Sequence, residues 1–354
     1  MRVARGVARY RPVLHGGPYS IENPHSVIVD FSSNINPLGA PHSVYKILKK
    51  AKISQYPDHN SDELKKAIAK HLGISKEMIT VGNGATEIIH NFARATVERG
   101  TPVLMPVPTF GEYEAASRMC GGKLEFFKTE NLCDDISEFV KRIPRNGVVF
   151  VCNPNNPSGL FVERDKILRI VRAAKRQGTY LFLDECFVEM MWDGNSAVPY
   201  VKRFENLFIL RSLTKSFGLA GLRIGYGIGS KRIASILNSI KIPWSVSSVA
   251  QEAAVAALSE KQFLTRTQTL IRQESEFLKK SLSLMGAQYS DSRTNFILIK
   301  TKIPSHLLKQ KLLRKKILVR DCSTFRGMGK NYIRIAIRIR RENEMLIRAL
   351  RSVL

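Results

Sequence analysis

The chain has 354 residues, 44% of them hydrophobic and 8% aromatic, which is enough for a large buried core and suggests two structural domains. The 56 Lys and Arg residues exceed the 30 Asp and Glu residues and give a net charge of +26. Because the basic residues are scattered and no zinc-finger or RNP-like pattern accompanies them, the charge disfavours a nucleic-acid partner and favours small anionic ligands. The five cysteines form no CxxC pair and no apolar run nears 20 residues, so we expect no metal site, no disulfide framework, no membrane span and a cytoplasmic location.

The first 40 residues are rich in turn formers and predict an arm, not a domain. His15-Gly16-Gly17 and the run from Asn34 to Gly39, which contains Asn36, lie on either side of a short apolar stretch. Asparagines that flank a proline are ordinary turn formers, so a plain turn and a substrate-lining role for this run stay equally open.

Two short helices should follow the arm. The first is expected from Ser43 to Lys50. The second should begin after Tyr56-Pro57-Asp58, with Ser61 as its N-cap and Glu63 in its first turn, because apolar residues then recur at helical spacing at Leu64, Ile68 and Leu72.

A glycine-rich turn then connects a strand to a helix. Met78 to Val81 is strand-like, the turn runs from Gly82 to Thr86 through Gly84 and Ala85, and a helix begins near Ile88. Free N–H groups and the positive end of a helix dipole attract anions at such a place. The turn is a candidate phosphate site, and an ordinary glycine turn is the alternative.

Strand and helix patterns alternate along the middle of the chain, which predicts an α/β fold with a mostly parallel sheet flanked by helices. Ligands of open parallel sheets bind at the carboxyl ends of the strands, where this chain places Phe110 and the asparagine-rich turn from Asn153 to Gly159. The Phe110 ring could stack on a flat cofactor. The expected elements are strands at Pro102 to Met105, Leu124 to Phe127, Val148 to Cys152, Tyr180 to Leu183 and Leu207 to Leu210, and helices around Gly111 to Met119 and Ile136 to Lys141.

An aspartate ends one of these apolar strands. Asp184 directly follows Tyr180 to Leu183, and burial of a carboxylate is costly unless a cation pairs with it. A protonated pyridine nitrogen would serve, because an aspartate there keeps the ring an electron sink. A helix cap or loop aspartate is the alternative, and we favour the cofactor.

One lysine lies between two hydroxyl groups in the run from Arg211 to Gly227. Lys215 follows Ser212 and Thr214 and directly precedes a further serine, several glycines come next, and Arg223 lies eight residues later. Lysine amines form Schiff bases with carbonyl cofactors, and the hydroxyls and the arginine would bind an anionic group. A solvated lysine on a glycine-rich loop is the alternative.

Beyond Gly227 the alternation gives way to long helices, expected from Lys231 to Ile240 and from Ala250 to Leu284, the second of which could join two domains. A smaller α+β region should follow, with strands at Phe296 to Lys300, Ile317 to Val319 and Tyr332 to Ile339 and a closing helix from Glu342 to Leu354. Strict alternation in the last strand puts its isoleucines on one face and Arg334, Arg338 and Arg340 on the other. Together with Arg320, these arginines could bind carboxylate or phosphate, or simply face solvent.

Four segments in this order, GNGATE, NPNNPSG, DECF and SLTKSFGLAGLRIGY, resemble the fold-type I enzymes that depend on pyridoxal 5'-phosphate. The resemblance covers essentially the whole chain. It implies an arm at residues 1–40 that joins the small domain, a large cofactor-binding domain at 41–250 and a small C-terminal domain at 251–354. It also implies a homodimer.

The resemblance further assigns roles to single residues. Lys215 would bind the cofactor covalently, Asp184 would pair with the pyridine nitrogen, Asn156 would hydrogen-bond the ring O3', and Phe110 would stack on the ring. The phosphate would lie on Gly84, Ala85, Thr86, Ser212, Thr214 and Arg223, with Tyr56 reaching it from the neighbouring subunit. The residues expected at the substrate are His15, Gly16, Asn36, Asn156, Arg320, Arg334 and Arg338.

Within this family the chain resembles the histidinol-phosphate aminotransferases and, more closely, the L-threonine O-3-phosphate decarboxylases of cobalamin biosynthesis. The segments DFSSNINPLG, PWSVS and RDCS carry the second likeness, as does Phe187, where the aminotransferases usually have a tyrosine. The expected activity is decarboxylation of threonine phosphate to 1-amino-2-propanol phosphate. Histidinol-phosphate transamination is the runner-up, and a nucleic-acid-binding protein that kept the fold without the catalysis is a rival of another class.

Overall fold

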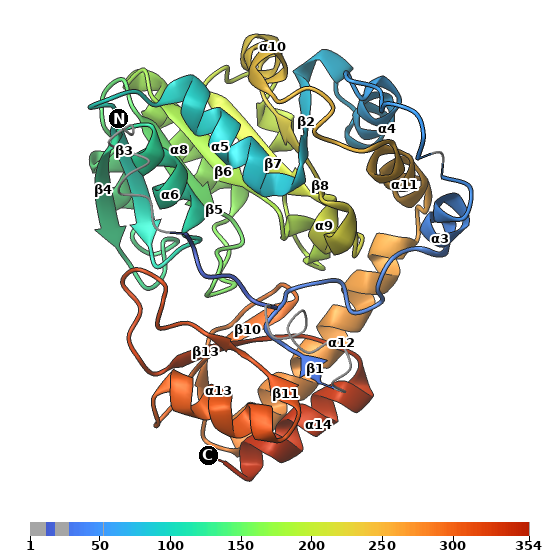
Figure 1. Cartoon of the computed structure of the whole chain (residues 1–354). Coiled ribbons are helices and arrows are strands. Elements are labelled where there is room, and N and C mark those ends of the chain that lie inside the picture. Colours follow the sequence, from blue (N-terminus) through green and yellow to red (C-terminus); the bar gives the residue numbers. More distant parts are fainter. Residues whose placement is uncertain (1–11, 18–27, 52, 354) are drawn as a thin grey trace, which may run out of the picture.

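The computed structural model describes residues 12–17, 28–51 and 53–353, and it consists of a large and a small unit (Figure 1). The large unit is built on a seven-stranded sheet and the small unit on a four-stranded one. No described helix is long and apolar enough to cross a membrane.

The large sheet has the strand order β2-β8-β7-β6-β5-β3-β4. β8 runs antiparallel to both of its neighbours, and the other neighbouring strands pair in parallel, so the prediction of a mostly parallel sheet is confirmed. The strands are β2 (Ile79–Asn83), β3 (Pro102–Val107), β4 (Lys123–Lys128), β5 (Val148–Cys152), β6 (Tyr180–Asp184), β7 (Leu207–Ser212) and β8 (Ile224–Ile228).

Alternate residues of the central strands pack against helices on the two faces of this sheet. Phe150, Phe182 and Phe208 lie around Phe92 of α5 (Gly84–Thr96), together with α6 (Glu112–Met119) and α10 (Lys231–Ile240). On the other face, Val149, Leu181 and Ile209 pack in a second core, to which α4 (Asp62–Leu72), α7 (Ile136–Lys141), α8 (Arg164–Arg176) and α11 (Ser248–Ser259) contribute. The apolar runs that predicted the strands are therefore buried on both sides.

The small unit is an antiparallel sheet in the order β12-β13-β10-β9. Its strands are β9 (Gln288–Tyr289), β10 (Phe296–Lys300), β12 (Arg320–Asp321) and β13 (Tyr332–Ala336), and its helices are α13 (Ser305–Arg314) and α14 (Arg340–Arg351). The long helix α12 (Phe263–Leu284) runs from the large unit to the small one (Figure 1).

The N-terminal arm is attached to the small unit through β1 (Val29–Asp30), which pairs in parallel with β11 (Ile317–Leu318). The Phe31 N–H continues this ladder by donating to the Leu318 carbonyl at 2.7 Å, and the Phe31 carbonyl accepts from the Ala336 N–H at 2.8 Å. The described part of the arm is thus hydrogen-bonded to the small unit. Residues 1–11 and 18–27, which the expected arm also includes, lie outside the described residues.

The prediction of one helix from Ala250 to Leu284 is wrong. The chain leaves the helix at Glu260 and starts again at Phe263, because α11 packs on α3 (His42–Leu48) and α4 while Phe263 stacks on Phe217 with 5.8 Å between ring centroids. The buried alanines of α11 belong to the core of the large unit. The junction between the units therefore lies near the start of α12, not at residue 250.

Two local predictions are also wrong. Ser61 precedes α4 in a left-handed conformation, and its hydroxyl does not cap the helix. The Asp58 carboxylate caps it instead, because it accepts a hydrogen bond from the Asp62 N–H at 2.6 Å. The strand expected to reach Ile339 ends at Ala336, so Arg338 and Arg340 are not strand residues. Ile333 and Ile335 are fully buried as the alternation predicted.

Candidate active site

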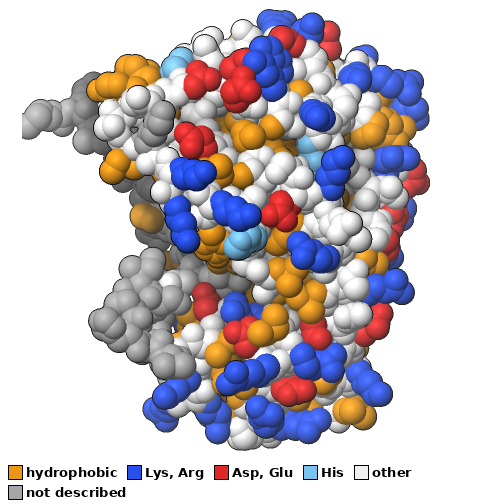
Figure 2. Space-filling model, turned by 90° about the vertical axis from the view of Figure 1, so that its right-hand side faces the viewer, with side chains coloured by type: hydrophobic (Ala, Val, Ile, Leu, Met, Phe, Trp, Pro, Cys, Tyr) orange, Lys and Arg blue, Asp and Glu red, His pale blue; other side chains and the backbone are white. Residues whose placement is uncertain are grey.

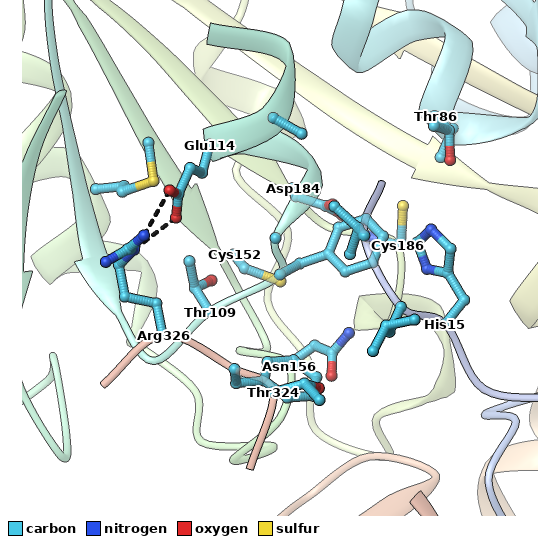
Figure 3. A pocket seen from close by; sticks show the side chains of 18 of the residues that line it. His15, Thr86, Thr109, Glu114, Cys152, Asn156, Asp184, Cys186, Thr324 and Arg326 are labelled. Atoms are coloured by element: carbon cyan, nitrogen blue, oxygen red, sulfur yellow. Dashed lines mark hydrogen bonds and ion pairs between the residues drawn. The ribbon is translucent and has the colours of Figure 1, made fainter. Parts of the chain in front are cut away.

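A cavity of about 1820 Å³ is bounded by the carboxyl ends of the parallel strands of the large sheet, by the N-terminal arm and by the edge of the small unit (Figure 3). It brings together residues that are far apart in the sequence, as the strand-end argument predicted. The predicted site residues that line it are His15, Gly16, Ala85, Thr86, Phe110, Asn156, Asp184, Ser212, Thr214, Lys215, Arg223, Arg320 and Arg334.

Asp184 ends β6 with its carboxyl group buried at the cavity wall. It accepts two hydrogen bonds, one from the Tyr113 hydroxyl at 2.6 Å and one from the Cys186 N–H at 2.9 Å, and it has no ion pair among the described residues. Burial raises the pKa of this carboxyl group, although the hydrogen bonds oppose the rise. A cation entering the cavity would find here a buried acid that lacks a charged partner.

An anion cradle lies at the N-terminus of α5. Gly84 adopts φ +77°, and a Cβ atom there would stand 2.6 Å from Nη2 of Arg223. A glycine is therefore required for the guanidinium to lie over the first turn of the helix. The helix N–H groups, the dipole and Arg223 together suit a phosphate group, and Ala85, Thr86, Ser212 and Thr214 line the same part of the cavity.

Lys215 lies on the short helix α9 (Leu213–Ser216), which directly follows β7. Burial and the positive charges of Arg334 and Arg223 lower the pKa of its amine to about 8. A substantial fraction of the amine is therefore neutral near physiological pH. A neutral amine is the form that attacks a carbonyl group.

Arg334 is buried at the base of the small-unit wall. One of its Nη atoms donates to the Asn156 side-chain oxygen and the other donates to the Ser32 carbonyl at 2.8 Å. Its Nε atom has no partner among the described residues, and burial lowers the pKa of the guanidinium to about 10. A buried, incompletely paired cation beside Asn156 is suited to a ligand carboxylate or phosphate.

Arg320 ties the arm to the small unit. It donates to the His15 carbonyl at 2.9 Å, to the Leu14 carbonyl and to the Thr324 hydroxyl at 3.2 Å. Gly16 passes so close to Ser32 that a Cβ atom would stand 2.6 Å from the Ser32 carbonyl oxygen. The arm is therefore held against the cavity by backbone contacts that need a glycine.

The His15 ring is held by a carboxylate from the large unit. Glu112 is buried at the start of α6 and contacts the His15 Nε2 at 2.9 Å and the His90 Nε2 at 3.0 Å. Burial alone would raise the pKa of this carboxyl group, but the two histidine contacts outweigh it and lower the pKa to about 2. Glu112 thus stays ionised and fixes His15 at the cavity wall.

An ion pair between the two units lies beside the cavity, on the side away from His15 (Figure 3). Arg326, from the small unit, reaches Glu114 of α6 with two contacts of 2.6 and 2.7 Å. Its guanidinium also lies 4.5 Å from the centroid of the Phe126 ring on β4. No local pattern predicts this pair, because the two residues are 212 positions apart in the sequence.

Four predicted residues do not line the cavity, and one of them, Gly84, opens α5 directly before Ala85, which does. The Asn36 amide is used inside the fold, donating to the Ser216 carbonyl at 2.7 Å and to the Thr267 hydroxyl at 2.9 Å. Arg338 pairs with Glu342 at 2.8 Å and donates to the Asp30 carbonyl. Tyr56 is 84% exposed on the surface, next to Trp244.

Sequence reasoning also missed residues of the site. Asn34, in the same run as Asn36 but two positions earlier, lines the cavity, is buried, and has no partner for either amide atom among the described residues. Period two would place Asn34 and Asn36 on the same side, so no sequence pattern separates the two asparagines. Tyr113, Cys152 and Cys186 around Asp184 gave no signal, since a tyrosine on an apolar helix face and isolated cysteines are ordinary core residues.

Phe187 lines the cavity wall and packs edge-on against Phe296, with 5.0 Å between ring centroids. A phenyl ring cannot donate a hydrogen bond. Among the described residues, no cluster of three or more His, Cys, Asp or Glu could hold a metal ion.

Comparison with known proteins places this geometry in context. Residues 26–351 match the profile of the class I and II aminotransferases. The chain is 36% identical to a protein of Caldanaerobacter subterraneus subsp. tengcongensis named "Putative threonine-phosphate decarboxylase", over 98% of this chain and 95% of that one. It is 33% identical to a histidinol-phosphate aminotransferase of Thermoanaerobacter pseudethanolicus, over 93% and 95%. The solved L-threonine-O-3-phosphate decarboxylase of Porphyromonas gingivalis superposes with a TM-score of 0.83 at 30% identity, over 92% and 99%.

Proposed function

The chain belongs to the class I and II aminotransferase family, and we propose that within it the protein decarboxylates L-threonine O-3-phosphate to (R)-1-amino-2-propanol phosphate, a step of cobalamin biosynthesis. The cofactor is pyridoxal 5'-phosphate. The observation that carries the proposal is the pair of arginines, Arg320 and Arg334, that the small unit contributes to one cavity, where both contact carbonyl groups of the arm. A substrate with both a carboxylate and a phosphate needs two such cations.

The residues of the cavity fit the cofactor. Asp184 is a buried acid without a charged partner and suits a protonated ring nitrogen. The α5 N-terminus under Arg223 suits the phosphate group, and the Lys215 amine, with its lowered pKa, suits the aldehyde. When bound, the cofactor accepts the electron pair that is left on Cα of the substrate when one of its bonds breaks.

The residues of this chain select which bond breaks by orienting the substrate. Arg320 and Arg334 hold its two anionic groups, with His15 fixed by Glu112 nearby. An orientation of the substrate that exposes the bond from Cα to the carboxylate to cleavage would release carbon dioxide, and one that exposes the bond from Cα to hydrogen would lead to transamination. Lys215 Nζ then returns a proton to Cα. Phe187, which cannot donate to the ring O3', is consistent with the first outcome.

Histidinol-phosphate transamination is the second candidate, because relatives of that name reach 33% identity over most of the chain. A paired assay separates the two. With threonine phosphate, the protein should release carbon dioxide and 1-amino-2-propanol phosphate without any keto acid. Efficient formation of glutamate from histidinol phosphate and 2-oxoglutarate would instead establish the aminotransferase.

The cofactor assignment has its own measurement. The purified protein should show a visible absorbance band of lysine-bound pyridoxal phosphate, and the Lys215→Ala variant should lose it. A colourless wild-type protein that cannot be loaded with the cofactor would contradict both enzyme readings.

We also propose a homodimer. Several large apolar side chains of the large unit are exposed. They include Tyr56, whose ring lies 5.1 Å from that of Trp244, and also Tyr45, Ile53 and Ile242. Burial of such side chains against a second copy would remove apolar surface from water. Tyr56 would then reach the cofactor phosphate of the partner subunit.

A further inference from the structure

The positive charge of the chain is concentrated in the small unit. Residues 285–354 contain 17 Lys and Arg but only 4 Asp and Glu, a net +13 out of the +26 of the whole chain. The stretch from Ser292 to Arg320 contains no acidic residue. On the side of the molecule that Figure 2 shows, basic and acidic side chains are interspersed.

Part of this charge forms one surface, which we call the α13 basic face. α13 buries Ser305, Leu308 and Leu312 and exposes His306, Leu307, Gln310, Lys311 and Arg314, so its exposed residues share one side of the helix. Lys302 and Lys330 lie at its N-terminal end, where the Ser305 N–H donates to the Lys330 carbonyl. The exposed cations of the face are Lys302, Lys311, Arg314, Lys315, Lys316 and Lys330.

These six cations have no acidic partner among the residues that the structure describes. Elsewhere, exposed cations such as Lys66 and Lys141 pair with carboxylates three or four residues away. The acid nearest to α13 in the fold, Asp321, is already engaged by the Ser305 hydroxyl at 2.7 Å and by the Ser323 N–H. The face therefore presents an uncompensated positive potential to an anionic partner.

The types of side chain on the α13 basic face indicate which kind of anionic partner it suits. Five of its six cations are lysines, whereas arginine predominates where phosphates of nucleic acids are gripped in bidentate fashion. No Phe, Tyr or Trp occurs from Lys302 to Lys316, which leaves only the His306 ring to stack on a base, and the N-terminus of α13 is occupied by its own contacts with Asp321 and Lys330. Lysine is also depleted in protein–protein interfaces.

An anionic lipid surface is the partner that the composition of the α13 basic face suits best. The aliphatic part of a lysine side chain can lie along the acyl chains while its ammonium group reaches the lipid headgroups. Leu307, which is 43% exposed beside these basic groups, can enter the interfacial region of the bilayer. Clusters of four to eight Lys and Arg on an amphipathic helix suffice for attraction to anionic lipids. We propose that the α13 basic face binds an anionic membrane surface reversibly.

The position of the face is compatible with catalysis. α13 lies at the end of the molecule remote from the large sheet (Figure 1), whereas Arg320 and Arg334 of the same unit line the cavity. A membrane in contact with α13 would leave the site accessible. The inference does not depend on which reaction the site performs.

The test measures sedimentation of the cofactor-loaded protein with vesicles of phosphatidylcholine containing about a third phosphatidylglycerol, against pure phosphatidylcholine. We expect binding to the anionic vesicles alone, weakened by high salt. The variant Lys311→Gln, Arg314→Gln, Lys315→Gln should bind at least about tenfold more weakly. A matched variant, Arg172→Gln, Lys175→Gln, Arg176→Gln, removes the same charge from exposed positions of α8 and should bind like the wild type.

Both variants should keep the cofactor band, the thermal melting temperature and the activity of the parent, because none of these residues lines the cavity. Equal losses in the two variants would mean that only net charge matters, and they would overturn the proposal. So would equal binding to both kinds of vesicle. Tighter binding to a 30-base-pair duplex, lost in the α13 variant, would overturn it in favour of a nucleic-acid partner.

Discussion

At the scale of single residues, Tyr113 shows how a core residue can act on a site without touching a ligand. Its ring stacks on Phe150 with 5.3 Å between centroids, as any buried aromatic would, while its hydroxyl donates to Asp184. That bond stabilises the ionised carboxylate in a place where burial favours the neutral form. Tyr113 is therefore a positioning residue that keeps Asp184 charged for the cofactor.

The Tyr113→Phe variant should bind pyridoxal phosphate more weakly, by roughly tenfold or more, because a hydrogen bond to a charged group is worth about 1.5–3 kcal/mol. Absorbance titration of the cofactor-free protein measures this. Tyr226→Phe is the matched control, since the Tyr226 hydroxyl is buried without a partner among the described residues. Equal affinities of the two variants would show that the bond to Asp184 is not what matters.

Asn34 and Asn36 offer a pair with opposite expected phenotypes. Asn34→Ala removes an amide that lines the cavity without a partner, so KM should rise while the melting temperature stays nearly unchanged. Asn36→Ala leaves the Ser216 carbonyl without its buried donor, which costs about 1–3 kcal/mol of stability, with little effect on KM. Steady-state kinetics and thermal melting distinguish the two, and a reversed pattern would contradict the site as described.

Lys215 should make loading of the cofactor-free protein pH-dependent. Its amine reacts when neutral, so below a pKa of about 8 the rate should rise nearly tenfold per pH unit and then level off. The Arg334→Gln variant lacks the charge that helps to lower this pKa, and its profile should move to higher pH. Stopped-flow absorbance between pH 6 and 10 checks both; a wild-type profile still rising at pH 10 would refute the lowered pKa.

At the scale of secondary-structure elements, the loop that follows β12 joins the small unit to the large one. Arg326 makes an ion pair with Glu114 of α6 and lies over Phe126, next to the cavity. Arg118, four residues after Glu114, shares the same carboxylate at 2.8 Å. The contact closes one side of the site only when the two units are together.

A double-mutant cycle with Glu114→Gln and Arg326→Gln should reveal this coupling in substrate binding. Each single change should raise KM several-fold, and the double variant should be little worse than either, with a coupling energy of about 1 kcal/mol. The effect should shrink at high salt because both side chains are partly exposed. Additive losses would mean that the two residues act independently of their contact.

Elements with strong periodicity were predictable, and their junctions were not. The strands β5 and β6 follow from apolar runs, and the α5 N-terminus from its glycines. The break between α11 and α12 left no mark in the sequence, because the residues at Glu260 to Gln262 are ordinary helix formers and only packing of α11 against α3 and α4 redirects the chain. The helix α4 is likewise capped by Asp58 and not by Ser61, because the turn before the helix brings the Asp58 carboxylate to the Asp62 N–H, which the preference of serine for N-cap positions does not predict.

The site itself was predictable to the extent that it lies at strand ends. Lys215, Asp184, Asn156 and Arg223 were found because each follows a recognisable strand or glycine turn. Glu112, Tyr113 and Glu114 were missed because they act through contacts with His15, Asp184 and Arg326 that no local pattern encodes. Arg338 was expected on the same strand face as Arg334, but the strand ends at Ala336 although the alternation in the sequence continues.

At the scale of the whole molecule, the exposed position of Tyr56 predicts complementation between subunits. Co-expressed Lys215→Ala and Tyr56→Phe chains should form mixed dimers in which one of the two sites has both an intact lysine and an intact tyrosine. Their activity should exceed that of either variant alone. If activity does not recover although mixed dimers are isolated, Tyr56 does not act across the interface.

The pairing of β1 with β11 has a consequence for how the protein is made. Val29 lies opposite Ile317, so the arm leaves the ribosome long before its partner strand has been synthesised. The large unit, whose strands from β2 to β8 are contiguous in the chain, can complete its sheet first. The small unit and the wall that holds His15 must wait for β13, since the Ala336 N–H of that strand donates to the Phe31 carbonyl of the arm. An incomplete nascent chain is thus left with a folded sheet but with no complete cavity to bind its cofactor.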